Sequence, residues 1–131
     1  MCIRDSNSSF GYLSGAEDHY LQTRSGYVDF WRDHRPAYGE NGTYGTFQYT
    51  AELRRIIRGY DSTDHDARLF IYMAYQNIHG PIQAPDNYTA LYPRVTYHPR
   101  LMCLAMVGAA AKPFAPCRTL SRSAWSVGMV D

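Results

Sequence analysis

"TFQYTAELRRIIRGYDSTDHDARLFIYMAYQ", residues 46–76, decides the fold class of this 131-residue chain. Its first half repeats apolar side chains at i, i+4, i+7, i+8 and i+11, which is the spacing of one face of an amphipathic helix. These side chains are Tyr49, Leu53, Ile56, Ile57 and Tyr60. The pattern predicts a helix that begins at Thr46, whose hydroxyl can cap an orphan amide of the first turn, and that ends at Gly59. On the opposite side, we interpret Arg54, Arg55 and Arg58 as a solvated face.

The second half, "RLFIYMAYQ" at 68–76, is a near-continuous run of large apolar and aromatic residues. Such a run is typical of a strand that is buried on both faces. A helix followed by a buried strand predicts an α/β fold. Ligands of open α/β sheets collect at the carboxyl ends of the strands, and His79 lies three residues past Gln76, where such an end is expected. Spacing alone leaves a second interpretation open, in which His79 is only a structural or solvated residue in a turn.

Composition narrows the class of protein. A chain with 45% hydrophobic residues can form one ordinary domain or part of a larger one. Its formal charge of +1, with arginines spread along the sequence, gives no basic stripe for nucleic acid. The longest apolar runs, at 69–75 and 101–111, are shorter than the roughly 20 residues that a membrane-spanning helix needs. We therefore expect neither a nucleic-acid partner nor a membrane span, and the N-terminus has no signal-peptide pattern.

Two further features of the sequence concern cysteines and loops. Cys2, Cys103 and Cys117 are an odd number without CxxC spacing, so neither a zinc site nor a disulfide framework is indicated. Residues 10–45 mix Gly, Tyr, Asp, Asn and Ser without a sustained period. This composition predicts turn-rich chain with short extended pieces such as "YVDFW" at 27–31.

Three stretches together carry a resemblance to a known family. They are "FGYLSGAEDHY" at 10–20, "VDFWRDHRPAYGENGTYGT" at 28–46 and "LFIYMAYQNIHGPIQAPDNY" at 69–88. In this order the chain resembles the sulfatase family, most closely its arylsulfatase B-like branch, over about residues 9–107. The resemblance implies part of an alkaline-phosphatase-like α/β domain, with a mixed sheet flanked by helices. It also implies a longer parent enzyme, lysosomal or secreted, that hydrolyses sulfate esters of aryl groups or glycosaminoglycan sugars.

The resemblance assigns one catalytic residue and leaves out others. Gln76, His79 and Pro81 match the family's Gln-x-x-His-x-Pro segment, whose histidine helps to protonate the leaving oxygen; His79 is therefore the candidate catalytic residue. The family's formylglycine nucleophile comes from a Cys-x-Pro-x-Arg motif, and Cys2 is followed by Ile-Arg-Asp instead. The family's calcium ligands also have no counterparts here, so we expect no metal ligands in this chain and no activity from the chain alone.

Both ends of the chain depart from the family pattern. From these departures we predict four segments. Residues 1–7 are interpreted as an adaptor-derived, non-native leader, and 8–107 as a partial sulfatase catalytic domain. Pro113 and Pro116 cannot continue a helix, whereas a reading frame one base earlier permits a family-like amphipathic sequence. We therefore interpret 108–127 as a frame-shifted segment and 128–131 as a return to the family-like frame.

Two sequons and two alternative functions complete the sequence predictions. Asn41 and Asn87 each begin an N-glycosylation acceptor sequence, which a lysosomal or extracellular parent would expose to modification. The twelve tyrosines are mostly interpreted as core or loop filler, with a carbohydrate platform as the alternative. The parent could instead be a phosphate or phosphonate hydrolase on the same scaffold, or a non-catalytic, sulfatase-like binding protein.

Overall fold

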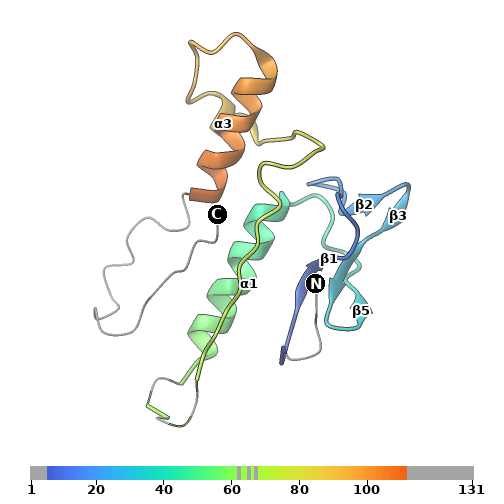
Figure 1. Cartoon of the computed structure of the whole chain (residues 1–131), viewed down its shortest axis with the longest axis vertical. Helices are drawn as coiled ribbons and strands as arrows, with labels where there is room; N and C mark the ends of the chain where they lie inside the picture. The colour runs from blue at the N-terminus through green and yellow to red at the C-terminus, as the bar shows by residue number, and fades with distance from the viewer. Residues whose placement is uncertain (1–5, 62, 65, 67, 112–131) are drawn as a thin grey trace.

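The computed structural model describes residues 6–61, 63–64, 66 and 68–111. Helices and two small antiparallel sheets make up this part of the chain, which is compatible with the predicted α/β class. In Figure 1, α1 lies in the middle, α3 at one end and the strands beside α1. In chain order the elements are β1 (Phe10–Tyr12), β2 (Thr23–Arg24), β3 (Tyr27–Val28), β4 (Phe30–Arg32), β5 (Arg35–Pro36), α1 (Gly45–Gly59), α2 (Asp86–Thr89) and α3 (His98–Ala111).

The strands are short, and every pair that they form is antiparallel. One sheet has the order β1-β4-β5, with Gly11 opposite Trp31 and Trp31 opposite Pro36. The other is the β2-β3 hairpin. The extended pieces predicted around "YVDFW" therefore exist as β3 and β4, whereas the mixed sheet expected from the resemblance is not formed by the described strands.

Helix α1 confirms the strongest prediction from the sequence, because it spans Gly45–Gly59 where 46–59 was expected. The predicted cap is wrong. Tyr44 holds the N-cap position without a side-chain cap, and the Thr46 hydroxyl donates instead to Asn77 Oδ1 at 2.6 Å. Thr46 is buried, and its hydroxyl bonds to the half-buried side-chain amide of Asn77 from a distant segment rather than to a first-turn amide of its own helix. Arg58, on the predicted solvated face, is exposed.

The predicted buried strand at 68–76 is also wrong. The segment is extended and runs along α1, but it pairs with no strand in the part of the chain that the structure describes (Figure 1). One side contacts α1, where the hydroxyls of Thr50 and Tyr75 lie 3.0 Å apart. The other side faces solvent, and Phe70 and Tyr72 are 88% and 65% exposed. A strand is buried on both faces only within a covered sheet, and β1–β5 pair with one another instead.

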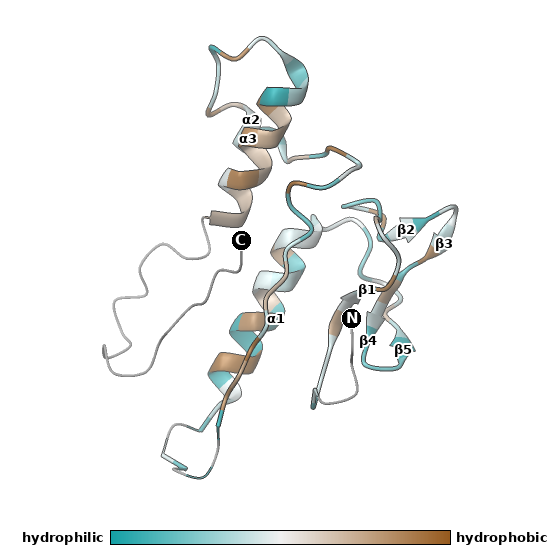
Figure 2. Cartoon of the chain, viewed as in Figure 1, coloured by the Kyte–Doolittle hydropathy of each residue, from teal (hydrophilic) through white to brown (hydrophobic). Residues whose placement is uncertain are grey.

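The core joins α1, α2 and α3 around tyrosine and small side chains. Its buried members are Tyr44, Ala84, Tyr88, Ala105, Met106 and Ala109. At Gly108, α3 passes close to α2, because a Cβ there would lie 3.4 Å from the Tyr88 ring. Figure 2 shows apolar residues along α3, whereas α1 alternates between polar and apolar turns. The sequence prediction included neither α2 nor α3.

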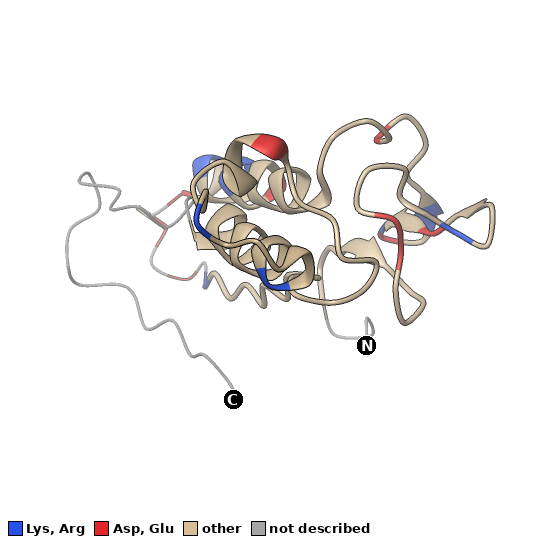
Figure 3. Cartoon of the chain, turned by 90° about the horizontal axis from the view of Figure 1, so that it is seen from above, with Lys and Arg blue, Asp and Glu red and all other residues tan. Residues whose placement is uncertain are grey.

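Several predictions about the ends, the charge and the cysteines can be compared with this structure. Helix α3 continues past the predicted boundary at 107/108 as far as Ala111. The leader residues 1–5 and the segments 112–127 and 128–131 lie outside the described residues, so these boundaries stay predictions. Acidic and basic residues interleave along the described chain (Figure 3). Among the described helices, none is long and apolar enough to cross a membrane. Cys103 is a free thiol.

Candidate acid–base site

His79 lies in a tight turn directly after the extended segment. Its backbone N–H donates to the carbonyl of Gln76 at 2.8 Å, which closes the turn. Its Nδ1 lies 2.9 Å from the carbonyl oxygen of Gly80, and the residue is exposed. When Nδ1 carries the proton and donates to this carbonyl, Nε2 is the ring atom left to exchange a proton with a substrate. The structure thus places the predicted catalytic histidine on the surface with one ring nitrogen fixed.

The first two residues of the turn hold it against the rest of the fold. Buried Gln76 donates from Nε2 to the carbonyl of Glu17 at 2.7 Å. Asn77 connects both long helices, because it accepts from Thr46 Oγ1 at 2.6 Å and donates to the Met106 carbonyl at 2.8 Å. Its Nδ2 also donates to the Tyr44 hydroxyl at 3.2 Å. The backbone that carries His79 is therefore held by the β1–β2 loop, α1 and α3 together.

A second histidine, His19, is buried and contacts the backbone of the turn that carries His79. It is 1% exposed, its ring stacks on Tyr44 with centroids 5.3 Å apart, and its Nε2 lies 3.4 Å from the carbonyl of His79. Burial lowers the pKa of His19, so the neutral ring is favoured and Nε2–H can donate to that carbonyl. His19 therefore positions the backbone of His79 and is itself shielded from solvent.

Glu17 is a buried carboxylic acid behind the same turn. It is 2% exposed, and its Oε1 accepts a hydrogen bond from the Tyr49 hydroxyl at 3.2 Å. Burial raises the pKa of Glu17 to about 8, with Asp29 and Asp18 adding to the shift. The side chain is therefore protonated and uncharged at neutral pH, which explains how it can be buried with no cation beside it among the described residues.

The carboxylates of Asp18 and Asp29, which lie near Glu17, accept hydrogen bonds that stabilise the surrounding loops. Asp18 accepts from the backbone of Tyr20 and Leu21 and from Gln83 Nε2 at 2.7 Å. Asp29 accepts from the backbone and hydroxyl of Ser14. The residues that the structure describes contain no group of three side chains that could hold a metal ion. The calcium that the resemblance implies for the parent does not fit these residues, so no chemical step here uses it.

The predicted sequons lie on other segments of the chain than the turn that carries His79. Asn41 is exposed in the loop before α1, and Asn87 is exposed within α2. Neither contributes to the turn that carries His79.

Sequence reasoning proposed His79 as the candidate catalytic residue and did not predict the residues that hold its turn. Glu17, His19 and Asn77 are polar, and a hydrophobic pattern assigns such residues to the surface. The one available signal was the position of "EDH" within the resemblance at 10–20, without any indication that Glu17 and His19 are buried. The partners that join Glu17 and His19 to the turn, Gln76 and His79, are 59 and 60 residues away along the chain, which only the folded structure reveals.

A surface histidine with a fixed ring nitrogen, held by a buried polar network, defines a candidate acid–base site. No family model matches the chain, and no solved structure matches it significantly. The chain is similar to arylsulfatase J of Mus musculus, with 34% identity over 95 residues. The match covers 68% of this chain, which spans about 15% of the length of that curated relative. This similarity supports a relationship to the sulfatase family. At the level of the family only, it supports a hydrolase of the sulfatase type.

Proposed function

We propose that this chain is part of a sulfatase that hydrolyses sulfate esters, with His79 as the proton donor to the leaving oxygen. The substrate class is an aryl sulfate or a sulfated glycosaminoglycan sugar, as in the arylsulfatase B-like branch. The parent has an alkaline-phosphatase-like fold and is lysosomal or secreted. Its formylglycine nucleophile and its calcium ligands come from parts of the parent that this chain does not contain.

The chemistry of His79 follows from its ring contacts. Cleavage of a sulfate ester leaves negative charge on the departing oxygen, and a poor leaving group needs a proton at that moment. With Nδ1 beside the Gly80 carbonyl, a protonated ring can donate from Nε2 to that oxygen. The neutral ring that remains can then take a proton from water for the next cycle.

The observation that carries this proposal is the rigid support of an exposed ring. Asn77 bonds to α1 and α3, and Gln76 bonds to the Glu17 carbonyl, so the turn that these two residues begin is anchored to the rest of the fold. A solvated loop histidine needs no such support. Precise placement of a proton donor is a requirement of acid catalysis, because proton transfer needs hydrogen-bond distance to the leaving atom.

The experiment is His79→Ala in the full-length parent, with a sulfate ester that has a poor leaving group. We expect kcat to fall by roughly 10² to 10⁴, while thermal unfolding stays as in the wild type. The loss should be smaller for a substrate with a good leaving group, because such a group needs little protonation. His34→Ala is the matched control, since His34 is also exposed but lies in the turn between β4 and β5. Wild-type kcat in His79→Ala on the poor leaving group would refute the assignment.

A further inference from the structure

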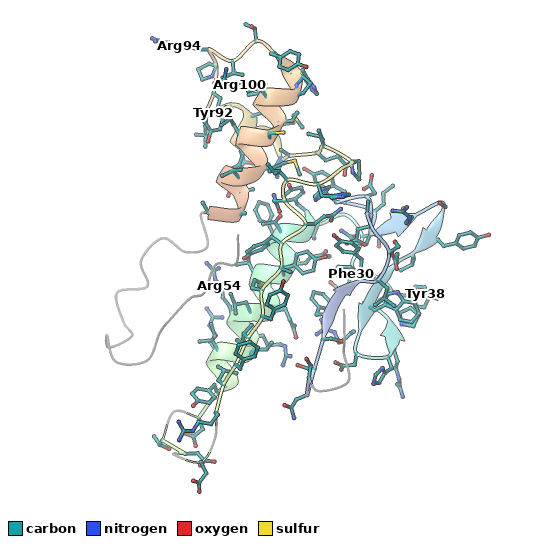
Figure 4. The ribbon with its side chains drawn as sticks, viewed as in Figure 1. Phe30, Tyr38, Arg54, Tyr92, Arg94 and Arg100 are labelled. Carbon is teal, nitrogen blue, oxygen red and sulfur yellow. The ribbon has the colours of Figure 1, made fainter. Side chains whose placement is uncertain are left out.

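A shallow hollow lies beside the strands, on the surface formed by the β2-β3 hairpin and the loop after β5. It has a volume of about 290 Å³, and it is lined by Leu21, Gln22, Val28, Tyr38 and Asn41 among others. Leu21 and Tyr38 are 55% and 76% exposed, so its wall is apolar and open to water. Figure 4 shows Tyr38 on the strand side of the molecule, away from the labelled Arg54 of α1.

The wall of this hollow contains an acceptor sequon. Asn41, Gly42 and Thr43 are all exposed, and Asn41 itself lines the hollow. From these observations we infer that Asn41 carries an N-linked glycan whose first sugar packs into the hollow against Tyr38. The inference rests on the proposed function, because only a chain that enters the secretory pathway meets the oligosaccharide donor. It goes further by choosing the site of modification and the surface that the sugar covers.

The covalent step is a transfer from a polyisoprenyl diphosphate-linked oligosaccharide. A bond forms between Nδ2 of Asn41 and C1 of the first N-acetylglucosamine. The bond between C1 and the diphosphate oxygen breaks, the polyisoprenyl diphosphate leaves with the bonding electrons, and one amide proton is released. No electrons are gained or lost by the protein.

The backbone of the sequon is held in place, so the first sugar has a defined starting point. The Gly42 N–H donates to the Tyr20 carbonyl at 2.7 Å, and the Thr43 carbonyl accepts from Gln22 Nε2 at 2.9 Å. Gln22 is 2% exposed and also lines the hollow. Gly42 has a φ of +94°, a left-handed conformation that favours glycine at the centre of this sequon. A fixed stem next to the hollow restricts the first sugar to its neighbourhood.

The chemistry of the hollow suits one sugar ring. Its volume is just below the roughly 300–1,000 Å³ that is usual for sites of drug-sized ligands, so it suits a single ring better than an extended glycan. The apolar face of a sugar ring can stack on the Tyr38 ring while the sugar hydroxyls remain in water, because tyrosine combines an apolar body with a polar tip. Covering Leu21 and Tyr38 in this way also removes apolar surface from solvent.

The second sequon has a less suitable setting. Asn87 is exposed, but the next residue, Tyr88, is buried in the core. The hydroxyl of Thr89 donates to the Asp86 carbonyl at 2.8 Å. This sequon is therefore part of a packed helical turn, and Asn87 does not line the hollow beside Asn41. It serves as an internal comparison for the site at Asn41.

The first measurement is peptide mapping of the 131-residue chain, expressed behind a secretory leader in a eukaryotic cell. Both secreted and retained material is collected, so that the result does not depend on secretion or on sulfatase turnover. We expect a glycan on the peptide that contains Asn41, its loss in Asn41→Gln and Thr43→Ala, and its retention in Thr43→Ser. An unmodified Asn41 in the wild-type chain would overturn the inference and would leave the proposed role of His79 untouched.

The second measurement tests the contact with Tyr38 by the rate at which an endoglycosidase removes the glycan from the folded chain. We expect release to be about fivefold faster in Tyr38→Ala, because the sugar is then no longer packed on the ring, and unchanged in Tyr38→Phe, which keeps the ring. Tyr27→Ala is the matched control, since Tyr27 is 80% exposed on the same β2-β3 hairpin but does not line the hollow. Equal rates in Tyr38→Ala and Tyr27→Ala, or a rate in Tyr38→Phe as fast as in Tyr38→Ala, would overturn the packing.

Discussion

Replacing Glu17 with glutamine should remove most of the loss of stability that the chain suffers as the pH rises. The folded chain keeps the Glu17 proton up to about pH 8, whereas the unfolded chain releases it near the ordinary pKa of 4.5. Between these values the folded state binds more protons than the unfolded state. The free energy of unfolding is therefore highest below this window, falls as the pH rises through it, and levels off above about pH 8.

The magnitude follows from the width of the window. Each unit of pKa difference corresponds to about 1.4 kcal/mol, so the full window amounts to on the order of 5 kcal/mol. Glutamine has nearly the same shape and can still accept from the Tyr49 hydroxyl, but it cannot ionise. His19 acts in the opposite direction, because its lowered pKa makes stability rise with pH until about 6.5. The difference between variant and wild type isolates Glu17 from this contribution.

The assay is urea-induced unfolding, followed by circular dichroism at low micromolar concentration. We expect Glu17→Gln and wild type to be similar near pH 5, and the variant to be more stable by several kcal/mol near pH 8.5. Asp18→Asn is the matched control. Although burial raises the pKa of Asp18, hydrogen bonds from Leu21, Gln83 and Tyr20 together lower it below its ordinary value. Asp18 is therefore ionised in both the folded and the unfolded chain at these two pH values, and its contribution to the free energy of unfolding is constant between them. The same pH dependence in Glu17→Gln and wild type would refute the reasoning.

Three further expectations concern the network, the activity and the exposed segment. Asn77→Ala should lower the free energy of unfolding by about 2–3 kcal/mol, because it removes hydrogen bonds to both long helices and leaves the buried Thr46 hydroxyl without its amide partner. A loss below about 0.5 kcal/mol in urea unfolding would contradict this expectation. The chain alone should not hydrolyse a chromogenic aryl sulfate, because the nucleophile and metal ligands supply most of such catalysis; turnover by pure chain would contradict this. The chain should associate as its concentration rises, because Phe70 and Tyr72 expose apolar rings on an extended segment that pairs with none of the described strands. Phe70→Lys should suppress the association in light scattering, and a wild-type chain that stays monomeric would contradict the expectation.

Local patterns predicted the parts of the fold that depend on local physics. The spacing of Tyr49, Leu53 and Ile56 identified α1 because the period of a helix is set by its own backbone hydrogen bonds. The segment 68–76 has the composition of a buried strand, but burial on both faces requires partner strands, and composition does not reveal whether they are present. The prediction of its burial failed for this reason, while its extended conformation was correctly inferred.

The candidate site divides in the same way. His79 was identified through a resemblance in a short segment, and its role remains a proposal. Burial raises the pKa of Glu17, so the side chain is neutral. The amide of half-buried Asn77 is satisfied by Thr46 of α1, by Tyr44 just before α1 and by the Met106 carbonyl of α3. Both effects arise from contacts between distant parts of the chain, so no pattern around either residue could have predicted them.

Sequencing the parent gene on both sides of this coding region tests most directly whether the chain is part of a sulfatase. The proposal predicts a Cys-x-Pro-x-Arg motif, or its serine equivalent, upstream of Phe10 in the same reading frame. It also predicts a pair of aspartates near the N-terminus of the parent and an Asp-Asn-Gly-Gly segment downstream. A threonine or serine nucleophile in another context would indicate a phosphate or phosphonate hydrolase, and absence of the metal-ligand aspartates would indicate a non-catalytic binding protein. Either of these two results would contradict the proposed function.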